Sequence, residues 1–249
     1  MERVHFEAIG WSSGGAALAI AGQALAVSIG AAASTVTGWA VLAAYLVVSC
    51  ALLLRGLVRS GATRFGAANR VTAVRSSLVG LVSGLVAASF FGPLSSAFLV
   101  AVVVPALVLD AVDGWVARRT RSVSPLGARF DMEVDAFLLL VLSVHVAGVL
   151  GPWVLAIGLL RYAFVAAGWM LPWLDRTLPA RYWRKVVTAV AGIALALASS
   201  GLAPGPSALL VAVALALLLE SFGRDVLWLV RRRHDAAAVR EPAVAQRSR

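Results

Sequence analysis

The stretch "LDAVDGWVARRTRSVSPLGARFDMEVDAF", residues 109–137, places four aspartates and four arginines in a chain that is 61% hydrophobic and only 14% charged. The mean hydropathy of the 249 residues is +0.89. Apolar runs recur on both sides of the stretch, and a helix of about 20 apolar residues crosses a bilayer while satisfying its own backbone hydrogen bonds. The runs do not alternate as the strands of a membrane barrel do. The sequence therefore predicts an all-α integral membrane protein.

Eight membrane spans are expected, and the connections between them differ in charge. The spans lie at residues 14–34, 37–57, 70–91, 95–117, 131–150, 153–173, 184–200 and 207–229. The connections after the first, third, fifth and seventh spans contain no Lys or Arg, whereas the others are rich in arginine. Because cytoplasmic loops carry the excess of Lys and Arg, both termini and every basic loop are predicted to be cytoplasmic. The expected location is the cytoplasmic membrane of a bacterium.

The same placement accounts for the net charge of +10. The arginines form a layer beside the cytoplasmic headgroups, where anionic lipids attract them. We therefore expect membrane lipids, and no nucleic acid, as partners of the basic residues. Cys50 is the only cysteine, so the sequence offers neither a disulfide framework nor a thiolate metal site.

The four aspartates of the opening stretch are spaced to meet. Asp110 and Asp113 are spaced i, i+3 at the end of one expected helix, and Asp131 and Asp135 are spaced i, i+4 on the next. Each pair shares one helix face, and a short turn containing "SVSPLG" makes the two helices antiparallel neighbours. Carboxylates that converge near lipid repel one another unless a cation neutralises them. Oxygen ligands suit Mg²⁺, Mn²⁺ or Ca²⁺, and four aspartates can hold two ions about 4 Å apart; interfacial salt bridges are the structural alternative.

The spacing of these residues is similar to a known signature. It reads D-x2-D-G-x2-A-R-x8-G-x3-D-x3-D from Asp110 to Asp135, with every fixed position filled. This pattern resembles the signature of the class I CDP-alcohol phosphatidyltransferases, or CDP-alcohol phosphotransferases. "ANRVTAVR", residues 68–75, also resembles the opening segment of that family, with Asn69, Thr72 and Arg75 at familiar positions.

The resemblance implies three segments. A six-helix CDP-alcohol phosphotransferase core is expected at residues 69–231, preceded by two extra transmembrane helices in residues 1–68. Residues 232–249 contain few apolar side chains other than Ala and Val and are expected to form a disordered cytoplasmic tail.

The resemblance also implies a reaction. The phosphatidyl group of a CDP-alcohol, CDP-diacylglycerol in the first place, passes to a small alcohol acceptor with release of CMP, and two Mg²⁺ or Mn²⁺ ions are the cofactor. Asp110, Asp113 and Asp131 match metal-binding aspartates, and Asp135 matches the general base, which also touches metal. Family precedent suggests a homodimer. The positions implied to line the site of the CDP moiety are Gly114, Ala117, Arg118, Gly127, Asn69 and Thr72.

Three basic residues are candidates for binding the acceptor. Arg161 lies inside the sixth expected span, where a charge indicates a functional site, although pairing with Glu133 or Glu220 explains it equally well. Arg184 and Lys185 resemble a basic family segment near the acceptor pocket, although the positive-inside rule also accounts for them. The identity of the alcohol stays open between inositol phosphate, glycerol phosphate, serine and others.

Two other classes of function compete with the transferase. Membrane prenyltransferases also use Asp-rich motifs and Mg²⁺, but in two separated loops, whereas this chain has one compact pair of motifs. A transporter or scaffold would need the aspartates as an ion pathway, and transport carboxylates lie near the middle of the membrane on broken helices. Metal-dependent release of CMP on addition of an alcohol distinguishes the three.

Overall fold

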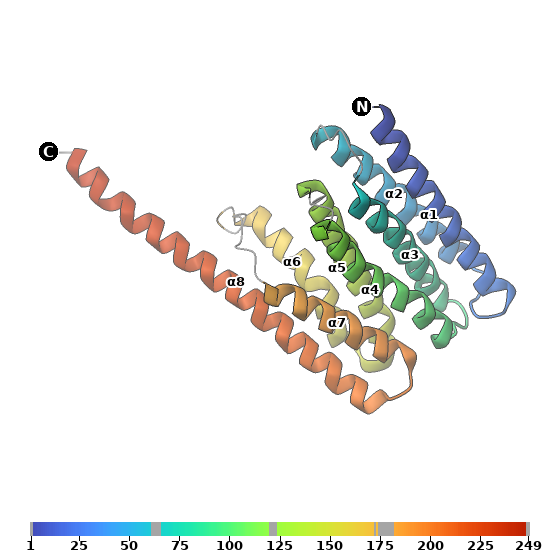
Figure 1. Ribbon diagram of the computed structural model, residues 1–249. Helices are drawn as coiled ribbons and strands as arrows, with labels where there is room; N and C mark the ends of the chain where they lie inside the picture. The colour runs from blue at the N-terminus through green and yellow to red at the C-terminus, as the bar shows by residue number, and fades with distance from the viewer. Residues whose placement is uncertain (1, 61–65, 120–123, 172, 174–181, 248–249) are drawn as a thin grey trace.

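The computed structural model describes residues 2–60, 66–119, 124–171, 173 and 182–247, and these residues form an up-and-down array of long helices (Figure 1). The helices are α1 (Glu2–Ser28), α2 (Val36–Ser60), α3 (Ala67–Ser89), α4 (Ser96–Arg119), α5 (Pro125–Leu150), the short 3-10 helix η1 (Pro152–Val154), α6 (Leu155–Met170), α7 (Tyr182–Ser200) and α8 (Pro204–Arg247). Each of the eight expected spans corresponds to one of the long helices. The all-α prediction is confirmed.

Seven of the described helices, α2 to α8, are long and apolar enough to cross a membrane. The first expected span, residues 14–34, corresponds to α1, which is not among these seven. Gly30 adopts a φ of 70°, a left-handed conformation that glycine enters without steric cost, and α1 ends before it at Ser28.

Helix α3 lies at the centre of the helix array and is the most buried of the candidate spans. Helices α1, α2, α4 and α5 all pack along it, while α7 packs on α4, α5 and α8. The hydrophobic core contains fully buried leucines from four helices: Leu85, Leu99, Leu142 and Leu195. The two N-terminal helices therefore cover one side of α3, and the helices that carry the four aspartates cover another.

Helices α2 and α3 approach one another closely at a pair of glycines. A Cβ atom on Gly38 would lie 2.9 Å from the carbonyl oxygen of Gly84, and one on Gly84 would lie 3.0 Å from the carbonyl oxygen of Gly38. Small residues let helix backbones approach in this way and increase the packing contact between them.

Helix α5 begins at Pro125, six residues earlier than the expected span at residue 131. The side chain of Ser124 caps the helix by accepting a hydrogen bond from the backbone N–H of Gly127 at 3.0 Å, and proline is favoured in the first turn because it needs no backbone partner there. The expected turn "SVSPLG" therefore contains the cap and first turn of α5. Asp131 and Asp135 lie in the second and third turns, on a helix that is already established.

Helix α8 continues to Arg247 and extends past the other helices (Figure 1). Residues 232–247, which belong to the tail expected at residues 232–249, are described as part of this helix. This part of the sequence contains "HDAAAVRE", and alanine, arginine and glutamate have high helix propensity. The last candidate span ends at Arg231. Helix α8 continues beyond it because these residues favour a helix even without a packed core.

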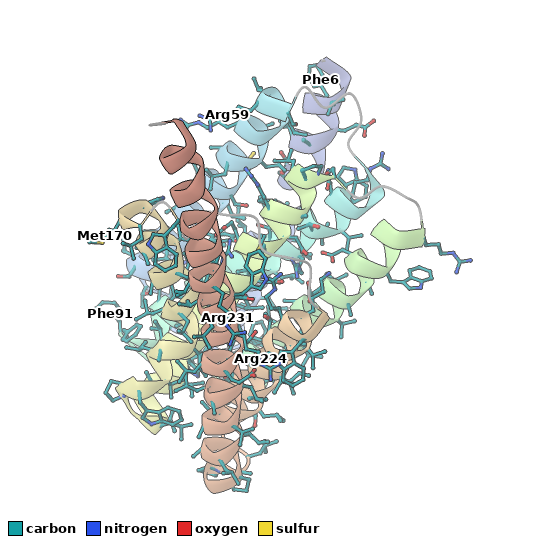
Figure 2. All side chains as sticks on the ribbon, turned by 90° about the vertical axis from the view of Figure 1, so that its left-hand side faces the viewer. Phe6, Arg59, Phe91, Met170, Arg224 and Arg231 are labelled. Carbon is teal, nitrogen blue, oxygen red and sulfur yellow. The ribbon has the colours of Figure 1, made fainter. Side chains whose placement is uncertain are left out.

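The outer surface of the helix array is strongly apolar. Figure 2 shows Phe91 and Met170 directed away from the helices, and their side chains are 68% and 82% exposed. Many other large hydrophobic residues are exposed along the helices in the same way. A soluble monomer rarely exposes so much apolar surface, and the seven apolar helices explain it because lipid replaces water around them.

Candidate active site and metal centre

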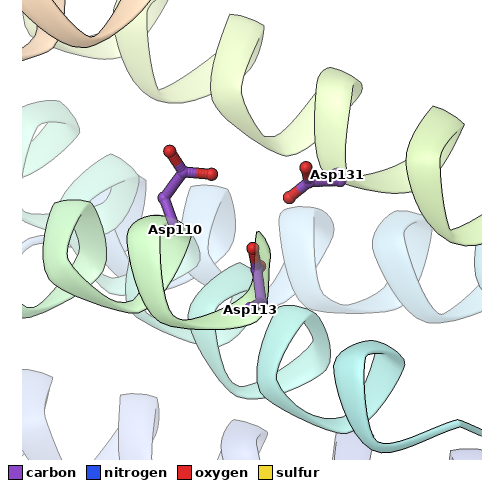
Figure 3. A group of neighbouring side chains, drawn as sticks. All are labelled: Asp110, Asp113 and Asp131. Atoms are coloured by element: carbon purple, nitrogen blue, oxygen red, sulfur yellow. The ribbon is translucent and has the colours of Figure 1, made fainter. Parts of the chain in front are cut away.

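Three of the four aspartates form a compact carboxylate group between α4 and α5. Asp110, Asp113 and Asp131 can each place one carboxylate oxygen within 4.8 Å of the others. Figure 3 shows the side chains of Asp110 and Asp113 rising from α4 and facing Asp131 on α5. The spacings i, i+3 and i, i+4 place each pair of aspartates on one helix face. Because α4 and α5 both pack along α3, the two pairs face one another.

The side chain of Arg75, on α3, lies among all four aspartates and is only 1% exposed. Its Nη1 donates to Asp110 Oδ1 at 2.5 Å and to Asp135 Oδ1 at 2.6 Å, and its Nη2 donates to Asp131 Oδ1. Its Nε lies 3.6 Å from Asp113 Oδ2. We call these five residues the aspartate–arginine cluster. The sequence did not single out Arg75 as a site residue, although the guanidinium joins the fourth aspartate, Asp135, to the other three.

The charges of the aspartate–arginine cluster do not balance. Four carboxylates face one guanidinium, so three negative charges remain when all five groups are ionised. Excess charge is costly in a partly buried site beside lipid, and a divalent cation removes that cost. The donor atoms are all carboxylate oxygens, which are the ligands that Mg²⁺ and Mn²⁺ prefer. The residues present therefore fit a divalent metal site.

The cluster is open on one side. The side chain of Asp113 is 4% exposed and lies deepest, whereas that of Asp110 is 39% exposed and those of Asp131 and Asp135 are intermediate. The hydroxyl of Thr72, on α3, donates to Asp113 Oδ2 at 3.1 Å and holds the deepest carboxylate. A ligand can therefore reach the carboxylates from the side of Asp110, while α3 forms the floor of the site.

The residues expected at the CDP moiety lie around this floor. Asn69 is buried on α3, three residues before Thr72, and a Cβ atom on Gly127 would lie 2.4 Å from Asn69 Oδ1. Gly127 is thus the position where the start of α5 meets α3 without a side chain. Gly114 is half-buried on α4. Ala117 and Arg118 also lie on α4, but their side chains are outside the described residues.

The three candidate acceptor residues lie outside the aspartate–arginine cluster. Arg161 pairs with Glu133, one of the two partners that the sequence allowed, and its Nη1 contacts the sulfur of Met132 at 3.3 Å. Arg184 pairs with the buried Asp225 at 3.2 Å. Lys185, the next residue, is exposed on α7, and its charge interacts favourably with Asp131.

Hydroxyl groups from α2 support α3 beside Arg75. Ser76 Oγ lies 3.1 Å from the hydroxyl of Tyr45 and 2.7 Å from Ser49 Oγ. The ring of Tyr45 also stacks on Phe137, two residues after Asp135, with a centroid separation of 5.0 Å. The N-terminal extension therefore contacts both α3 and α5 next to the site.

A comparison with protein families identifies the class of this protein. The model of the CDP-alcohol phosphatidyltransferase family matches residues 65–220, which is well over half of the chain and includes every member of the aspartate–arginine cluster. The chain therefore belongs to the CDP-alcohol phosphatidyltransferase family, whose members are membrane transferases of phospholipid biosynthesis. The match begins next to α3, so α1 and α2 lie outside it. Searches of curated proteins and of solved structures found no significant match.

Proposed function

We propose that this protein transfers the phosphatidyl group of CDP-diacylglycerol to a small alcohol, releasing CMP, at the aspartate–arginine cluster. The observation that carries the proposal is the convergence of four carboxylates from α4 and α5 on one guanidinium, within the residues that match the family. Family membership supports this reaction over a prenyltransferase or a transporter. The positive-inside pattern supports an active site and both termini on the cytoplasmic side.

Asp110, Asp113, Asp131 and Asp135 would hold two Mg²⁺ or Mn²⁺ ions. When bound, such ions neutralise the charge of the diphosphate and stabilise the charge that develops on the attacking and leaving oxygens. The described geometry supports this assignment through the close approach of the first three carboxylates and through the link from Asp135 to the same guanidinium.

Asp135 is the proposed general base. Its carboxylate accepts the proton of the acceptor hydroxyl as the hydroxyl oxygen attacks the β-phosphorus of the donor. A new phosphorus–oxygen bond forms, the bond between that phosphorus and the bridging oxygen breaks, and CMP leaves with the electron pair. Asp135 suits this role because its side chain is 25% exposed and can be reached, whereas Asp113 is almost enclosed.

The CDP moiety is proposed to bind along the floor of the site, at Asn69, Thr72, Gly114 and Gly127, together with Ala117 and Arg118. Gly127 keeps the start of α5 clear beside Asn69, and Thr72 holds the carboxylate of Asp113 in place. The absence of a side chain on Gly114 leaves room for a planar base and a ribose to approach the backbone of α4.

Among the proposed acceptor residues, Lys185 has the strongest support. Arg161 and Arg184 already contact carboxylates of Glu133 and Asp225, while Lys185 is exposed and interacts favourably with Asp131. A lysine ammonium beside the cluster would attract a phosphate or carboxylate of the acceptor. We further propose, from family precedent, that the protein acts as a homodimer.

An acceptor screen tests the proposed function. Membranes that contain the protein are supplied with labelled CDP-diacylglycerol, Mn²⁺ and one alcohol at a time, and the lipid products are separated. One alcohol is expected to give a new labelled phospholipid with an equal amount of CMP, and Lys185→Gln is expected to raise the KM for an anionic acceptor. Glu7→Gln serves as the control because Glu7 lies in an exposed ion pair on α1. If purified protein binds CDP-diacylglycerol but yields no CMP with any alcohol, the proposal is wrong.

A further inference from the structure

The Arg75 guanidinium binds the oxygen atoms that a metal ion would need. It contacts Asp110 Oδ1, Asp131 Oδ1 and Asp135 Oδ1 by hydrogen bonds and lies beside Asp113 Oδ2. Three of these four aspartates form the candidate metal group. Because each carboxylate has a limited number of lone pairs directed into the site, the guanidinium and a metal ion compete for them.

Arg75 is also the only residue of the cluster that carries positive charge, and it is almost completely enclosed. Without it, four carboxylates would face one another in a partly buried site, and their repulsion would separate α4 from α5 or keep some of them protonated. A guanidinium suits this position because its planar set of five N–H donors can contact several carboxylates at once. It neutralises only one of the four negative charges, so the site retains a strong attraction for a further cation.

We propose that Arg75 is a resident counter-cation of the aspartate cluster, which holds the carboxylates together before metal binds and gives up some of their oxygens when metal enters. Arg75 is then a positioning residue for the proposed metal site, and the inference rests on the proposed function. It keeps the four aspartates in place without metal, at the cost of a weaker affinity for the metal.

The surroundings of Arg75 fit this role. Thr72, one helical turn earlier on α3, holds Asp113 from the same face by a hydrogen bond of 3.1 Å. The neighbouring Ser76 is fixed to α2 through Tyr45 and Ser49. The backbone of α3 beside Arg75 is therefore held on both sides. If Arg75 gave up its contacts with the carboxylates, its side chain would change conformation while the helix kept its position.

The test is a Mn²⁺ titration of the purified full-length protein in detergent, without substrate, after removal of metal with a chelator. Free Mn²⁺ is measured by electron paramagnetic resonance for the wild type, Arg75→Gln, Arg75→Lys and Arg129→Gln. Arg129 is the matched control because it is an exposed arginine two residues before Asp131, so its loss removes the same charge without releasing a carboxylate.

We expect Arg75→Gln to bind Mn²⁺ at least about tenfold more tightly than the wild type, because one charge-assisted hydrogen bond given up on binding corresponds to about a factor of ten. Arg75→Lys should bind severalfold more tightly than the wild type, because an ammonium reaches fewer carboxylates than a guanidinium. Arg129→Gln should stay within about twofold of the wild type, since an exposed charge is screened by solvent. Without metal, Arg75→Gln should melt at a lower temperature than the wild type. Added Mn²⁺ should raise the melting temperature of Arg75→Gln by more than it raises that of the wild type.

Mn²⁺ binding by Arg75→Gln that equals or is weaker than that of the wild type overturns the inference and leaves the metal site standing. If Arg75→Gln does not fold, Arg75→Lys decides in the same way, and equal or weaker binding by that variant overturns the inference. If neither the wild type nor the folded Arg75 variants bind Mn²⁺, the metal site of the proposed function is wrong as well.

Discussion

Two groups of charged residues in this protein differ in their ratio of negative to positive groups. In the aspartate–arginine cluster, four carboxylates share the guanidinium of Arg75. Four other ion pairs in the described helices each join one basic and one acidic group, and we call them the peripheral ion pairs: Arg70–Glu7, Arg161–Glu133, Arg184–Asp225 and Arg224–Glu220. Both groups contain acidic and basic residues close together, but only the cluster has an excess of negative charge. This excess, and not the presence of charge beside lipid, indicates a cation site.

The largest effect is expected from Asp135→Asn. An amide cannot accept the proton of the acceptor hydroxyl, so the rate of CMP release should fall by about 10²- to 10⁴-fold, the usual contribution of a general base. The variant should still fold and insert in the membrane, because an asparagine can keep one hydrogen bond to Arg75. Glu133→Gln, two residues earlier in a peripheral ion pair, should retain most of its turnover. A wild-type rate for Asp135→Asn would remove Asp135 from the mechanism.

A loss of metal affinity is expected from Asp110→Asn. This change removes the negative charge of one proposed metal ligand while its remaining amide oxygen can still accept from Arg75, so Mn²⁺ should bind at least about tenfold more weakly, and excess Mg²⁺ should not restore turnover. Titration with Mn²⁺ measures the first effect, and CMP release measures the second. Unchanged Mn²⁺ affinity would show that the cluster is a set of ion pairs like the peripheral ones.

The corresponding change in a peripheral ion pair is Asp225→Asn, and it should affect stability instead of metal binding. Asp225 is buried and accepts a hydrogen bond from Arg184 at 3.2 Å. Its replacement should lower the free energy of unfolding by about 1–3 kcal/mol, as is typical for a buried charge-assisted hydrogen bond, and leave Mn²⁺ affinity unchanged. Thermal melts in detergent and Mn²⁺ titration check both statements, and a tenfold change in affinity would contradict the distinction between the two groups.

The smallest effect is expected from Tyr45→Phe, at the contact between the N-terminal extension and the core. The change removes the hydroxyl that lies 3.1 Å from Ser76 Oγ and keeps the ring stacked on Phe137. Stability should fall by about 0.5–1.5 kcal/mol, the net contribution of one hydrogen bond. Tyr45→Ala, which also removes the ring, should melt at a clearly lower temperature. Equal melting temperatures for both variants and the wild type would show that this contact does not couple the extension to the core.

The sequence predicts the aspartate cluster well because its information is local. Spacings of i, i+3 and i, i+4 place Asp110 with Asp113 and Asp131 with Asp135 on shared helix faces, and the short connection makes the two helices neighbours. The structure brings the first three together within 4.8 Å. Their roles as metal ligands and base remain predictions.

Arg75 illustrates what the sequence leaves open. The positive-inside rule accounts for any arginine near a membrane surface, so the sequence does not indicate that the side chain of Arg75 faces the aspartates. The packing of α3 between α1, α2, α4 and α5 turns its side chain inward instead. A signal was present in the sequence, since Asn69, Thr72 and Arg75 are spaced three residues apart, and the segment 68–75 that contains them resembles the opening segment of the family.

The helix ends show the same contrast. The start of α5 at Pro125 depends on the cap provided by Ser124, and the end of α1 depends on the left-handed turn at Gly30. Apolar runs alone do not record either feature, because both are properties of single residues at the ends of a run. The helical extension of α8 follows from propensity, which hydropathy does not measure.

The central claim is that the excess of carboxylates binds a divalent cation for phosphatidyl transfer. The most direct measurement is CMP release from CDP-diacylglycerol by chelator-treated membranes, followed as Mn²⁺ is added in the presence of the acceptor found in the screen. We predict no release without metal, a rise to a plateau with added Mn²⁺, and no rise with Asp110→Asn. Release at the plateau rate in the presence of the chelator, or an equal rise with Asp110→Asn, would contradict the claim.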